Sequence, residues 1–214
     1  MNKEQVAEVA MITHIVLDMG GVLVGLQWQE RMEGLLGRAL PMAELHHLWV
    51  TATSTVAFES GHTDFDQFTA AFLGEFNLPV DPDFFKQEFL NLVQAPLPNC
   101  QRVLQDLKAR FHLSLLSNTN PAHYDKLSRD YDFYRTFDHC FLSYQMGHMK
   151  PSAASFEYVM THLNTRPETI AFFDDGDRNV EAAKSLGINA FRVDSPDEVW
   201  AIAQGFSPGA GAQR

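Results

Sequence analysis

Three short apolar segments, each ending at a polar residue, constrain the fold more than any other feature of the chain. The segments span residues 13–17, 113–116 and 170–173, and the polar residues that follow them are Asp18, Ser117 and Asp174. Apolar runs of this length, bounded by turn signals, are typical of strands buried on both faces of a parallel sheet. Helix-like segments separate them, such as residues 177–186 before Gly187. This alternation predicts an α/β fold with a doubly wound, Rossmann-like parallel sheet, to which residues 139–142 and 189–193 add further strands.

The pattern changes between residues 26 and 97, where no strand is predicted. Thr63 is expected to cap a helix on which phenylalanines recur at steps of three and four residues, and Asp81-Pro82 is expected to open another. The phenylalanines are Phe65, Phe68, Phe72 and Phe76. Because this spacing is typical of core packing, we expect an all-helical bundle inserted after the first strand, as a cap over the strand ends.

The predicted organisation is therefore a core interrupted by this cap. The core comprises residues 11–25 and 98–205, and the cap comprises residues 26–97. Residues 206–214 are rich in glycine, alanine and proline and have little to bury, so we expect them to form a disordered tail.

The charge and composition of the chain limit its partners. The 214 residues carry a formal net charge of -11 at pH 7, without any run of Lys and Arg. Such a field repels nucleic-acid backbones and anionic lipids, so we expect neither nucleic-acid nor membrane partners. Cys100 and Cys140 lack the spacing of a metal site or a disulfide framework, and no apolar stretch has the length of a signal peptide or a membrane span. These features indicate a cytoplasmic protein with reduced thiols and leave its oligomeric state open.

The polar residues at the strand ends form a candidate site. In a doubly wound sheet, ligands bind at the carboxyl ends of the strands, where Asp18, Ser117 and the pair Asp174-Asp175 are expected to meet. Carboxylates gathered in one place repel one another, which makes a hard cation such as Mg²⁺ the natural occupant of the space between them. Alternatively, one member of the pair caps the next helix, although Asp177 can fill that role.

Two further segments supply what a site for phosphoryl transfer needs besides carboxylates. Such a site combines a nucleophile, a divalent cation, hydroxyl and amide donors for the phosphate oxygens, and a fixed positive charge. Ser117-Asn118 offers the donors and Lys150 offers the charge. Taken alone, Ser-Asn is also ordinary turn chemistry, and a lysine is usually exposed.

These residues match, in order across nearly the whole chain, the motifs of the haloacid dehalogenase superfamily. The segments that resemble its motifs are residues 15–23, residues 115–118, Lys150-Pro151 and residues 172–175. The resemblance implies that Asp18 is the nucleophile. The implied phosphate-binding residues are Ser117, Asn118 and Lys150, of which Ser117 and Lys150 join Asp18 in catalysis. The implied Mg²⁺ ligands are Asp18, the main-chain carbonyl of Gly20, Asp174 and Asp175.

Gly20 is the one departure from the usual pattern. Most phosphatases of the superfamily place an aspartate there, two residues after the nucleophile, and a general acid of this kind contributes about 10²–10⁴-fold to the rate. The branch that contains sugar-1-phosphate phosphatases and the phosphatase domains of epoxide hydrolases also carries glycine there, and residues 58–61, 117–120 and 174–182 resemble that branch. The proton could then come from Mg²⁺-bound water, from the substrate or from a cap histidine such as His62, although for His62 a solvated turn residue beside Gly61 is the favoured interpretation.

The resemblance implies a Mg²⁺-dependent phosphatase that hydrolyses a small phosphomonoester, such as a sugar 1-phosphate, through an aspartyl-phosphate on Asp18. A non-catalytic or weakly active module that binds phosphate and Mg²⁺ is the main alternative, because Gly20 removes the usual acid. A receiver domain would have these groups in another order, and a dehalogenase would lack the acidic pair. Substrate specificity is expected to lie in cap residues facing the site. The candidates are Gln27, Trp28, Arg31, His46, His47 and Trp49.

Overall fold

A parallel sheet forms the centre of the computed structural model, which describes residues 11–208. Its strands are β2 (His14–Leu17), β5 (His112–Ser117), β6 (His139–Leu142), β7 (Ile170–Asp174) and β8 (Asn189–Arg192). They lie in the order β6-β5-β2-β7-β8, and all neighbouring pairs are parallel. Each of these strands was predicted from the sequence, and the doubly wound α/β architecture is confirmed.

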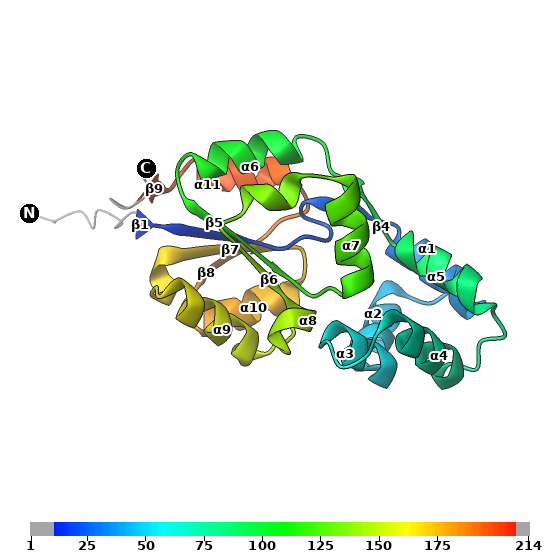
Figure 1. The fold of residues 1–214 in the computed structure, drawn as a ribbon. Coiled ribbons are helices and arrows are strands. Elements are labelled where there is room, and N and C mark those ends of the chain that lie inside the picture. The colour runs from blue at the N-terminus through cyan, green and yellow to red at the C-terminus, as the bar shows by residue number, and fades with distance from the viewer. Residues whose placement is uncertain (1–10, 209–214) are drawn as a thin grey trace, which may run out of the picture.

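Helices cover both faces of this sheet, as Figure 1 shows. One face packs against α6 (Cys100–Lys108) and α11 (Pro196–Ala203), and the other packs against α9 (Ala153–Leu163) and α10 (Asp177–Ser185). The helix α7 (Pro121–Asp130) follows β5, and the short α8 (Ser143–Met146) follows β6. The 3-10 turns η1 (Phe133–Thr136) and η2 (Pro167–Thr169) precede β6 and β7. Two apolar cores, one on each face, thus hold the strands in place.

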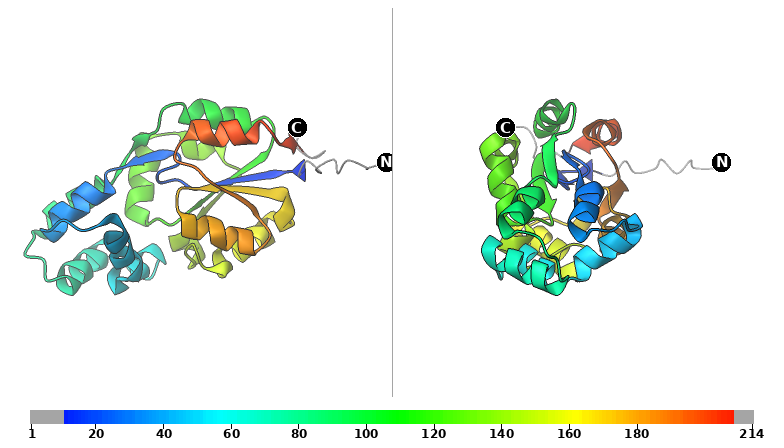
Figure 2. Two further views of the ribbon diagram at one scale, coloured as in Figure 1. Left: turned by 180° about the vertical axis from the view of Figure 1, so that it is seen from behind. Right: turned by 90° about the vertical axis from the view of Figure 1, so that its right-hand side faces the viewer.

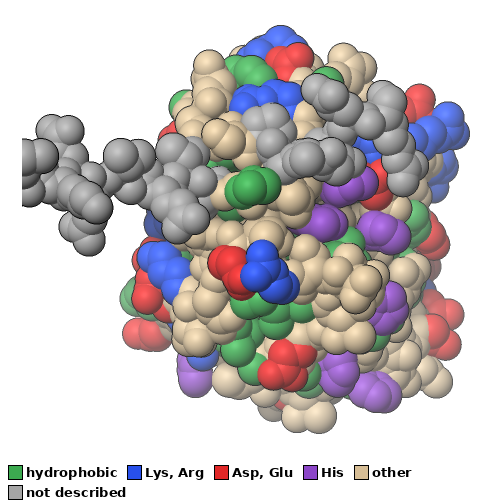
Figure 3. Space-filling view, turned by 90° about the vertical axis from the view of Figure 1, so that its left-hand side faces the viewer, with side chains coloured by type: hydrophobic (Ala, Val, Ile, Leu, Met, Phe, Trp, Pro, Cys, Tyr) green, Lys and Arg blue, Asp and Glu red, His purple; other side chains and the backbone are tan. Residues whose placement is uncertain are grey.

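The register of the central strands brings their carboxyl ends to one edge. Leu17 of β2 lies opposite Leu115 of β5 and Phe173 of β7. The residues that follow these strands must therefore meet at that edge. Figure 3 shows the molecule from the side on which the N-terminus lies in Figure 1, where histidine side chains gather. The rings of His14 and His112, at the starts of β2 and β5, stack with their centroids 5.1 Å apart.

The inserted segment forms a helical bundle that extends away from the sheet (Figure 2). Its helices are α1 (Trp28–Leu36), α2 (Met42–Thr51), α3 (Thr53–Glu59), α4 (Phe65–Glu75) and α5 (Pro82–Leu90). They enclose an apolar core of their own, in which Trp49, Phe68 and Phe89 are central. We call this bundle the cap. Asp81 caps α5 as expected, but Asp64, in a capping box with Gln67, caps α4 in place of the predicted Thr63.

Two short strands connect the cap to the core, although no strand was predicted between residues 26 and 97. Strand β3 (Val24–Leu26) pairs antiparallel with β4 (Val93–Pro96). Both are too short for an alternating pattern to appear, and β3 contains a glycine while β4 ends at a proline. Their pairing, rather than their sequence, defines them.

The predicted disordered tail was wrong at its beginning. Strand β9 (Ser207–Pro208) pairs in parallel with β1 (Met11–Ile12), because the end of the chain returns beside its first described residues. The ring of Phe206 packs at 5.8 Å from that of Phe191 and 6.4 Å from that of Phe173. The rest of the predicted tail, residues 209–214, lies outside the described residues. Between residues 11 and 208, no helix has the length and apolarity needed to cross a membrane.

Candidate active site

Asp18 and Lys150 form a buried ion pair at the carboxyl edge of the sheet. Asp18 follows β2 directly, and its backbone N–H donates to the carbonyl of Phe173 on β7 at 2.8 Å, which fixes the turn. The Nζ of Lys150 lies 2.7 Å from Oδ1 of Asp18 and 2.6 Å from Oδ2 of Asp174. Lys150 is only 4% exposed and Asp18 only 8%. A buried lysine between two carboxylates is far from the usual exposed position of this residue type, and its charge is fixed where the resemblance places it.

Asp174 and Asp175 have different surroundings. Asp174 is fully buried, and its Oδ1 accepts hydrogen bonds from the backbone N–H of Gly176 at 2.8 Å and from Nδ2 of Asn179 at 2.9 Å. Because Lys150 contacts its Oδ2, both oxygens of Asp174 already have partners. Gly176 is the N-cap of α10 and Asp177 the first helical residue, so the expectation that Asp177 would cap this helix was wrong. Asp175 has no side-chain hydrogen bond among the described residues and is the freer carboxylate.

The three carboxylates of Asp18, Asp174 and Asp175 form the cluster expected from the sequence. Each offers an oxygen, and these oxygens lie within 4.8 Å of one another. Burial raises the pKa of Asp18 to about 7, with Lys150 opposing the shift and Asp174 and Asp175 adding to it. Burial and the neighbouring Asp174 raise the pKa of Asp175 to about 6. Around Lys150, the attraction of Asp174 and Asp18 outweighs burial and raises the pKa of the ammonium group. One lysine facing three carboxylates leaves negative charge uncompensated, and hard carboxylate oxygens in this arrangement suit Mg²⁺.

Two residues near this cluster had no role in the sequence analysis. Gly21 has a φ of +76°, and a Cβ at this position would lie 2.3 Å from Oδ2 of Asp175, so only glycine lets the backbone approach that carboxylate. Asn179 orients Asp174 from the first turn of α10. Sequence reasoning could have found Asn179 from its position one helical turn after the acidic pair, whereas the requirement at Gly21 is visible only in three dimensions.

The segment Ser117-Asn118 lies at the same edge of the sheet, but its two side chains have different hydrogen-bond partners. Ser117 is 1% exposed, and its Oγ donates to the carbonyl of Asn118 at 3.4 Å, a weak contact that leaves the hydroxyl available to another partner. The side chain of Asn118 instead holds the backbone of Lys150. Its Oδ1 accepts from the N–H of Lys150, and its Nδ2 donates to the carbonyl of the same residue, both at 2.8 Å. Any direct contact of Asn118 with phosphate therefore falls to its backbone amide.

Leu26 fills the space beside Gly20. A Cβ on Gly20 would lie 3.1 Å from Cδ1 of Leu26, whose side chain is 44% exposed. Gly20 itself does not have a positive φ. An apolar side chain therefore borders the position at which most phosphatases of the superfamily carry their acid.

The specificity candidates of the cap are not equivalent. Trp49 is buried in the core of the cap, and Arg31 forms an ion pair with Glu88 at 2.7 Å, so neither is free. His46 lies edge-on to Trp28, with ring centroids 6.3 Å apart. Burial and then the positive charge of Arg178 lower the pKa of His46. Arg178 belongs to α10, in the first turn after the acidic pair.

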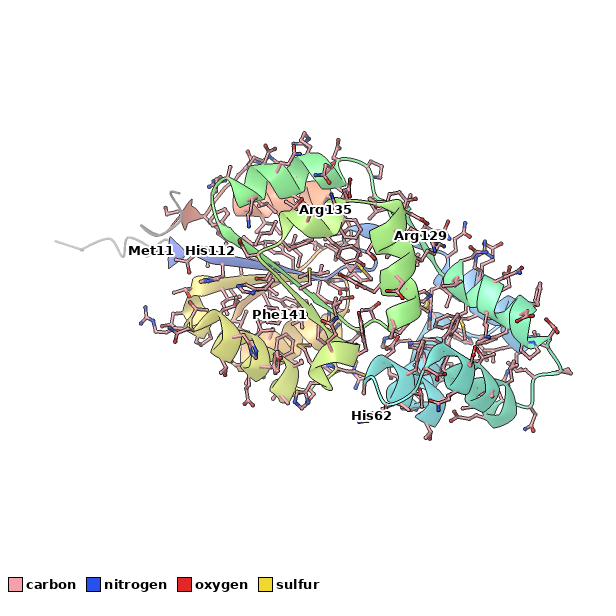
Figure 4. All side chains as sticks on the ribbon, viewed as in Figure 1. Met11, His62, His112, Arg129, Arg135 and Phe141 are labelled. Atoms are coloured by element: carbon pink, nitrogen blue, oxygen red, sulfur yellow. The ribbon has the colours of Figure 1, made fainter. Side chains whose placement is uncertain are left out.

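His62 occupies a position that does not support a catalytic role. It follows Gly61 in the turn after α3 and is exposed at the edge of the molecule beside α3 (Figure 4). Gly61 has a φ of +77°, and a Cβ there would lie 2.1 Å from the carbonyl of Tyr144. The turn therefore contacts α8 of the core through Gly61, while the imidazole of His62 lies in solvent.

Comparisons with known proteins give matches in both sequence and structure. A model of the haloacid dehalogenase-like hydrolase family matches residues 12–187. D-ribitol-5-phosphate phosphatase of Bacteroides thetaiotaomicron is 27% identical over 198 residues, which cover 86% of this chain and 93% of that protein. The solved structure of a predicted HAD-like family hydrolase from Porphyromonas gingivalis is 25% identical with a TM-score of 0.72, and the match covers 91% of this chain and 98% of that one.

The same fold occurs in a solved complex. A HAD family enzyme from Bacteroides thetaiotaomicron, crystallised with magnesium and inorganic phosphate, is 21% identical with a TM-score of 0.71. The match covers 85% of this chain and 93% of that one. The family match spans most of the sheet and the acidic cluster. This chain therefore belongs to the haloacid dehalogenase-like hydrolase family.

Proposed function

We propose that the protein is a Mg²⁺-dependent phosphatase that hydrolyses a small phosphomonoester, such as a sugar phosphate, through an aspartyl-phosphate on Asp18. The observation that carries this proposal is the buried cluster of Asp18, Asp174 and Asp175 around the ammonium group of Lys150. Its relatives add support, since one is named D-ribitol-5-phosphate phosphatase and a solved enzyme of the same fold binds magnesium and inorganic phosphate. The resemblance to sugar-1-phosphate phosphatases favours a phosphate on an anomeric carbon.

The residues of the chain divide the work as follows. Asp18 attacks phosphorus through one carboxylate oxygen, the bond between phosphorus and the ester oxygen breaks, and the alcohol leaves with a proton from water or from the substrate itself. Lys150 opposes the rise in the pKa of Asp18 that burial causes and offsets the charge of the phosphoryl group. The Oγ of Ser117 and the backbone amide of Asn118 donate to phosphoryl oxygens, while the Asn118 side chain fixes the backbone of Lys150. Asp174 and Asp175, with Asp18 and the carbonyl of Gly20, would hold Mg²⁺, which when bound screens the charge of the phosphate. Water then attacks the phosphoryl group on Asp18, the bond between phosphorus and the Asp18 oxygen breaks, and inorganic phosphate and a proton leave the regenerated carboxylate.

The proposal is tested with a panel of phosphate esters. Sugar phosphates, acyl phosphates, nucleotides and aryl phosphates are incubated with the protein and Mg²⁺, and free phosphate is measured with and without EDTA. We expect release from at least one sugar phosphate and its loss in EDTA. Release that EDTA leaves unchanged would contradict the Mg²⁺ site.

A module that binds without turnover is the second candidate, and the absence of an acid at Gly20 favours it. Calorimetry with inorganic phosphate in the presence of Mg²⁺ separates the two candidates. Binding of phosphate without hydrolysis of any ester in the panel would replace the enzyme by this module.

A further inference from the structure

His123 joins the cap to the core in a buried contact. It lies on α7, is 6% exposed, and its ring stacks on Phe89 of cap helix α5 with centroids 4.4 Å apart and planes 8° apart. One ring nitrogen, Nε2, is 2.8 Å from the carbonyl oxygen of Phe89. The other, Nδ1, is 3.1 Å from Nδ2 of Asn120. A single imidazole thus connects a helix of the cap with a residue of the core.

The partners of this imidazole determine its protonation. The Phe89 carbonyl can only accept, so Nε2 carries the hydrogen, and Nδ1 is left to accept from the amide of Asn120. The other end of that amide is also used, since Oδ1 of Asn120 accepts from the backbone N–H of His123 at 3.0 Å. Burial lowers the pKa of His123 to about 4, so the ring stays neutral at physiological pH. The hydrogen bonds are therefore directional and allow one arrangement of both side chains.

Asn120 closes the loop that contains Ser117 and Asn118. It is fully buried and is the N-cap of α7. The hydroxyl of Ser143 holds Thr119 in the middle of this loop, because its Oγ accepts from the Thr119 N–H and donates to the Thr119 carbonyl, both at 2.9 Å. Asn118 in turn holds the backbone of Lys150. We call residues 117–120 the strand-end loop. Its position depends on contacts at Asn118, Thr119 and Asn120.

A second residue of α7 binds the same end of α5 but makes no hydrogen bond to the strand-end loop in the described part of the chain. Nζ of Lys126 lies 2.7 Å from the carbonyl of Leu90 and 3.2 Å from that of Val93. A positive charge at a helix C-terminus is favourable and satisfies carbonyls that lack helical partners. The hydrogen bonds of Lys126 therefore anchor the cap without reaching Asn120, whereas His123 contacts both the cap and Asn120.

We propose that Asn120 and His123 are positioning residues that transmit the docking of the cap on α7 to the strand-end loop, and through Asn118 to Lys150. Docking of α5 holds the ring of His123, the ring holds the amide of Asn120, and that amide fixes the end of the loop. The consequence for catalysis rests on the proposed function. The mechanical link does not, because it consists of contacts present without substrate.

Two variants of His123 divide the link into its halves. In His123→Gln, the terminal amide nitrogen is as far along the side chain as Nε2, so donation to Phe89 is kept and the acceptor for Asn120 is lost. In His123→Asn, the side-chain oxygen replaces Nδ1, so the acceptor is kept and the contact with Phe89 is lost. Lys126→Met is the matched control, because it removes an anchor of the cap that does not contact the loop. Hydrogen exchange is measured for peptides covering residues 85–93 and 115–124, with α9 as a distant reference.

We expect both His123 variants to speed exchange in residues 115–124 by about tenfold, the usual effect of leaving a buried hydrogen-bonding group unpaired. Lys126→Met should speed exchange only in residues 85–93. Unchanged exchange in residues 115–124 in either His123 variant would overturn the proposal, as would an equal increase in α9, which would indicate general destabilisation.

Activity gives an independent readout. With an ester found in the panel, kcat/KM should fall by about tenfold in both His123 variants and stay within about twofold in Lys126→Met. If kcat/KM is the same in His123→Gln, His123→Asn and Lys126→Met, the link has no role in positioning. If the wild type hydrolyses no ester, the proposed function fails, while the exchange experiment still decides the proposed link.

Discussion

Asp174 and Asp175 are neighbours in the chain, but their side chains have different tasks. Both oxygens of Asp174 have partners, namely Lys150, the Gly176 amide and Asn179, whereas the Asp175 carboxylate has no side-chain partner in the described part of the chain. The raised pKa of Asp175 reflects burial beside the Asp174 carboxylate, which the charge of Lys150 offsets only in part. We infer that Asp175 serves the cation and that Asp174 mainly holds the lysine and the turn.

This difference gives a prediction for two alanine variants. Asp175→Ala should raise the Mg²⁺ concentration for half-maximal rate by about a hundredfold or more and leave the metal-free protein as stable as the wild type or more stable. Asp174→Ala should change the Mg²⁺ requirement less, but it breaks a buried ion pair and should cost about 3–5 kcal/mol of folding free energy. Magnesium titrations of activity and thermal unfolding measure both effects. If Asp174→Ala raises the Mg²⁺ requirement more than Asp175→Ala, or if Asp175→Ala loses more stability than Asp174→Ala, the roles of the two carboxylates would be reversed.

Gly20 gives a second prediction, which concerns the leaving group. Without an acid, the rate should depend steeply on the pKa of the leaving group, so that aryl, acyl and anomeric phosphates react faster than alkyl phosphates. Gly20→Asp should help alkyl phosphates most, by about 10–10²-fold. Gly20 has no positive φ, and the neighbour of the new Cβ is the flexible end of Leu26, so the change is sterically feasible if Leu26 moves.

The companion variants make this prediction sharper. Adding Leu26→Ala to Gly20→Asp should increase the gain, because it removes the side chain that borders the new carboxylate. Gly21→Asp is the matched control, and it should fail because Gly21 has a positive φ and faces Asp175. Plots of log rate against leaving-group pKa are compared for the well-folded variants. Parallel, shallow lines for the wild type and Gly20→Asp would show that another group already supplies the proton.

At the scale of elements, the sequence was informative where a local signal exists. Three buried strands, which lead to Asp18, Ser117 and Asp174, were predicted because a run of apolar residues followed by a polar one is local information. The N-cap at Asp81 was correct for the same reason. Strands β3 and β4 were missed because a short antiparallel pair depends on a partner far along the chain. The use of Asn118 and His123 was equally invisible, since their partners Lys150 and Phe89 lie more than one element away.

A buried carboxylic acid in the cap should make the stability of the cap depend on pH. Glu59, the last residue of α3, is 6% exposed, and burial raises its pKa from 4.5 to about 7, with a hydrogen bond from Trp49 opposing the shift. A folded-state pKa above the unfolded value means that the contribution to stability is complete below about pH 4.5 and is lost as the pH rises through 7. The amount at stake is at most about 3 kcal/mol.

Glu59→Gln tests this dependence. The variant should melt at a higher temperature than the wild type at pH 8, and the difference should shrink toward pH 5. Glu75→Gln is the control with the opposite sign, because the Glu75 carboxylate accepts hydrogen bonds from the amides of Thr53 and Ser54 at the start of α3. Its loss should lower stability at pH 8 by about 1 kcal/mol. A difference in melting temperature between wild type and Glu59→Gln that stays the same from pH 5 to pH 8 would show that Glu59 does not gain a buried charge in this range.

At the scale of the whole molecule, the core carries the acidic cluster and the family motifs, and the cap carries the candidate specificity residues. The family motifs lie on the sheet and its loops, which is why the sequence predicted the acidic cluster and the fold together. The cap side of the site, by contrast, depends on how two bodies meet. Trp49 and Arg31 were candidates for substrate contact and proved to have partners within the cap, whereas the pKa of His46 is lowered by burial and by the charge of Arg178 on the core. Charge and composition carry no information on that arrangement.

Asp18 is the residue that we propose accepts the phosphoryl group. The most direct measurement compares phosphate release by wild type, Asp18→Asn and Asp177→Asn, with the best ester of the panel and Mg²⁺. Asp177 is an exposed neighbour of the acidic pair and is the matched control. We predict that Asp18→Asn lowers kcat by about four orders of magnitude or more while the variant stays folded, and that Asp177→Asn remains close to wild type. A folded Asp18→Asn variant that releases phosphate within about tenfold of the wild-type rate would contradict the account.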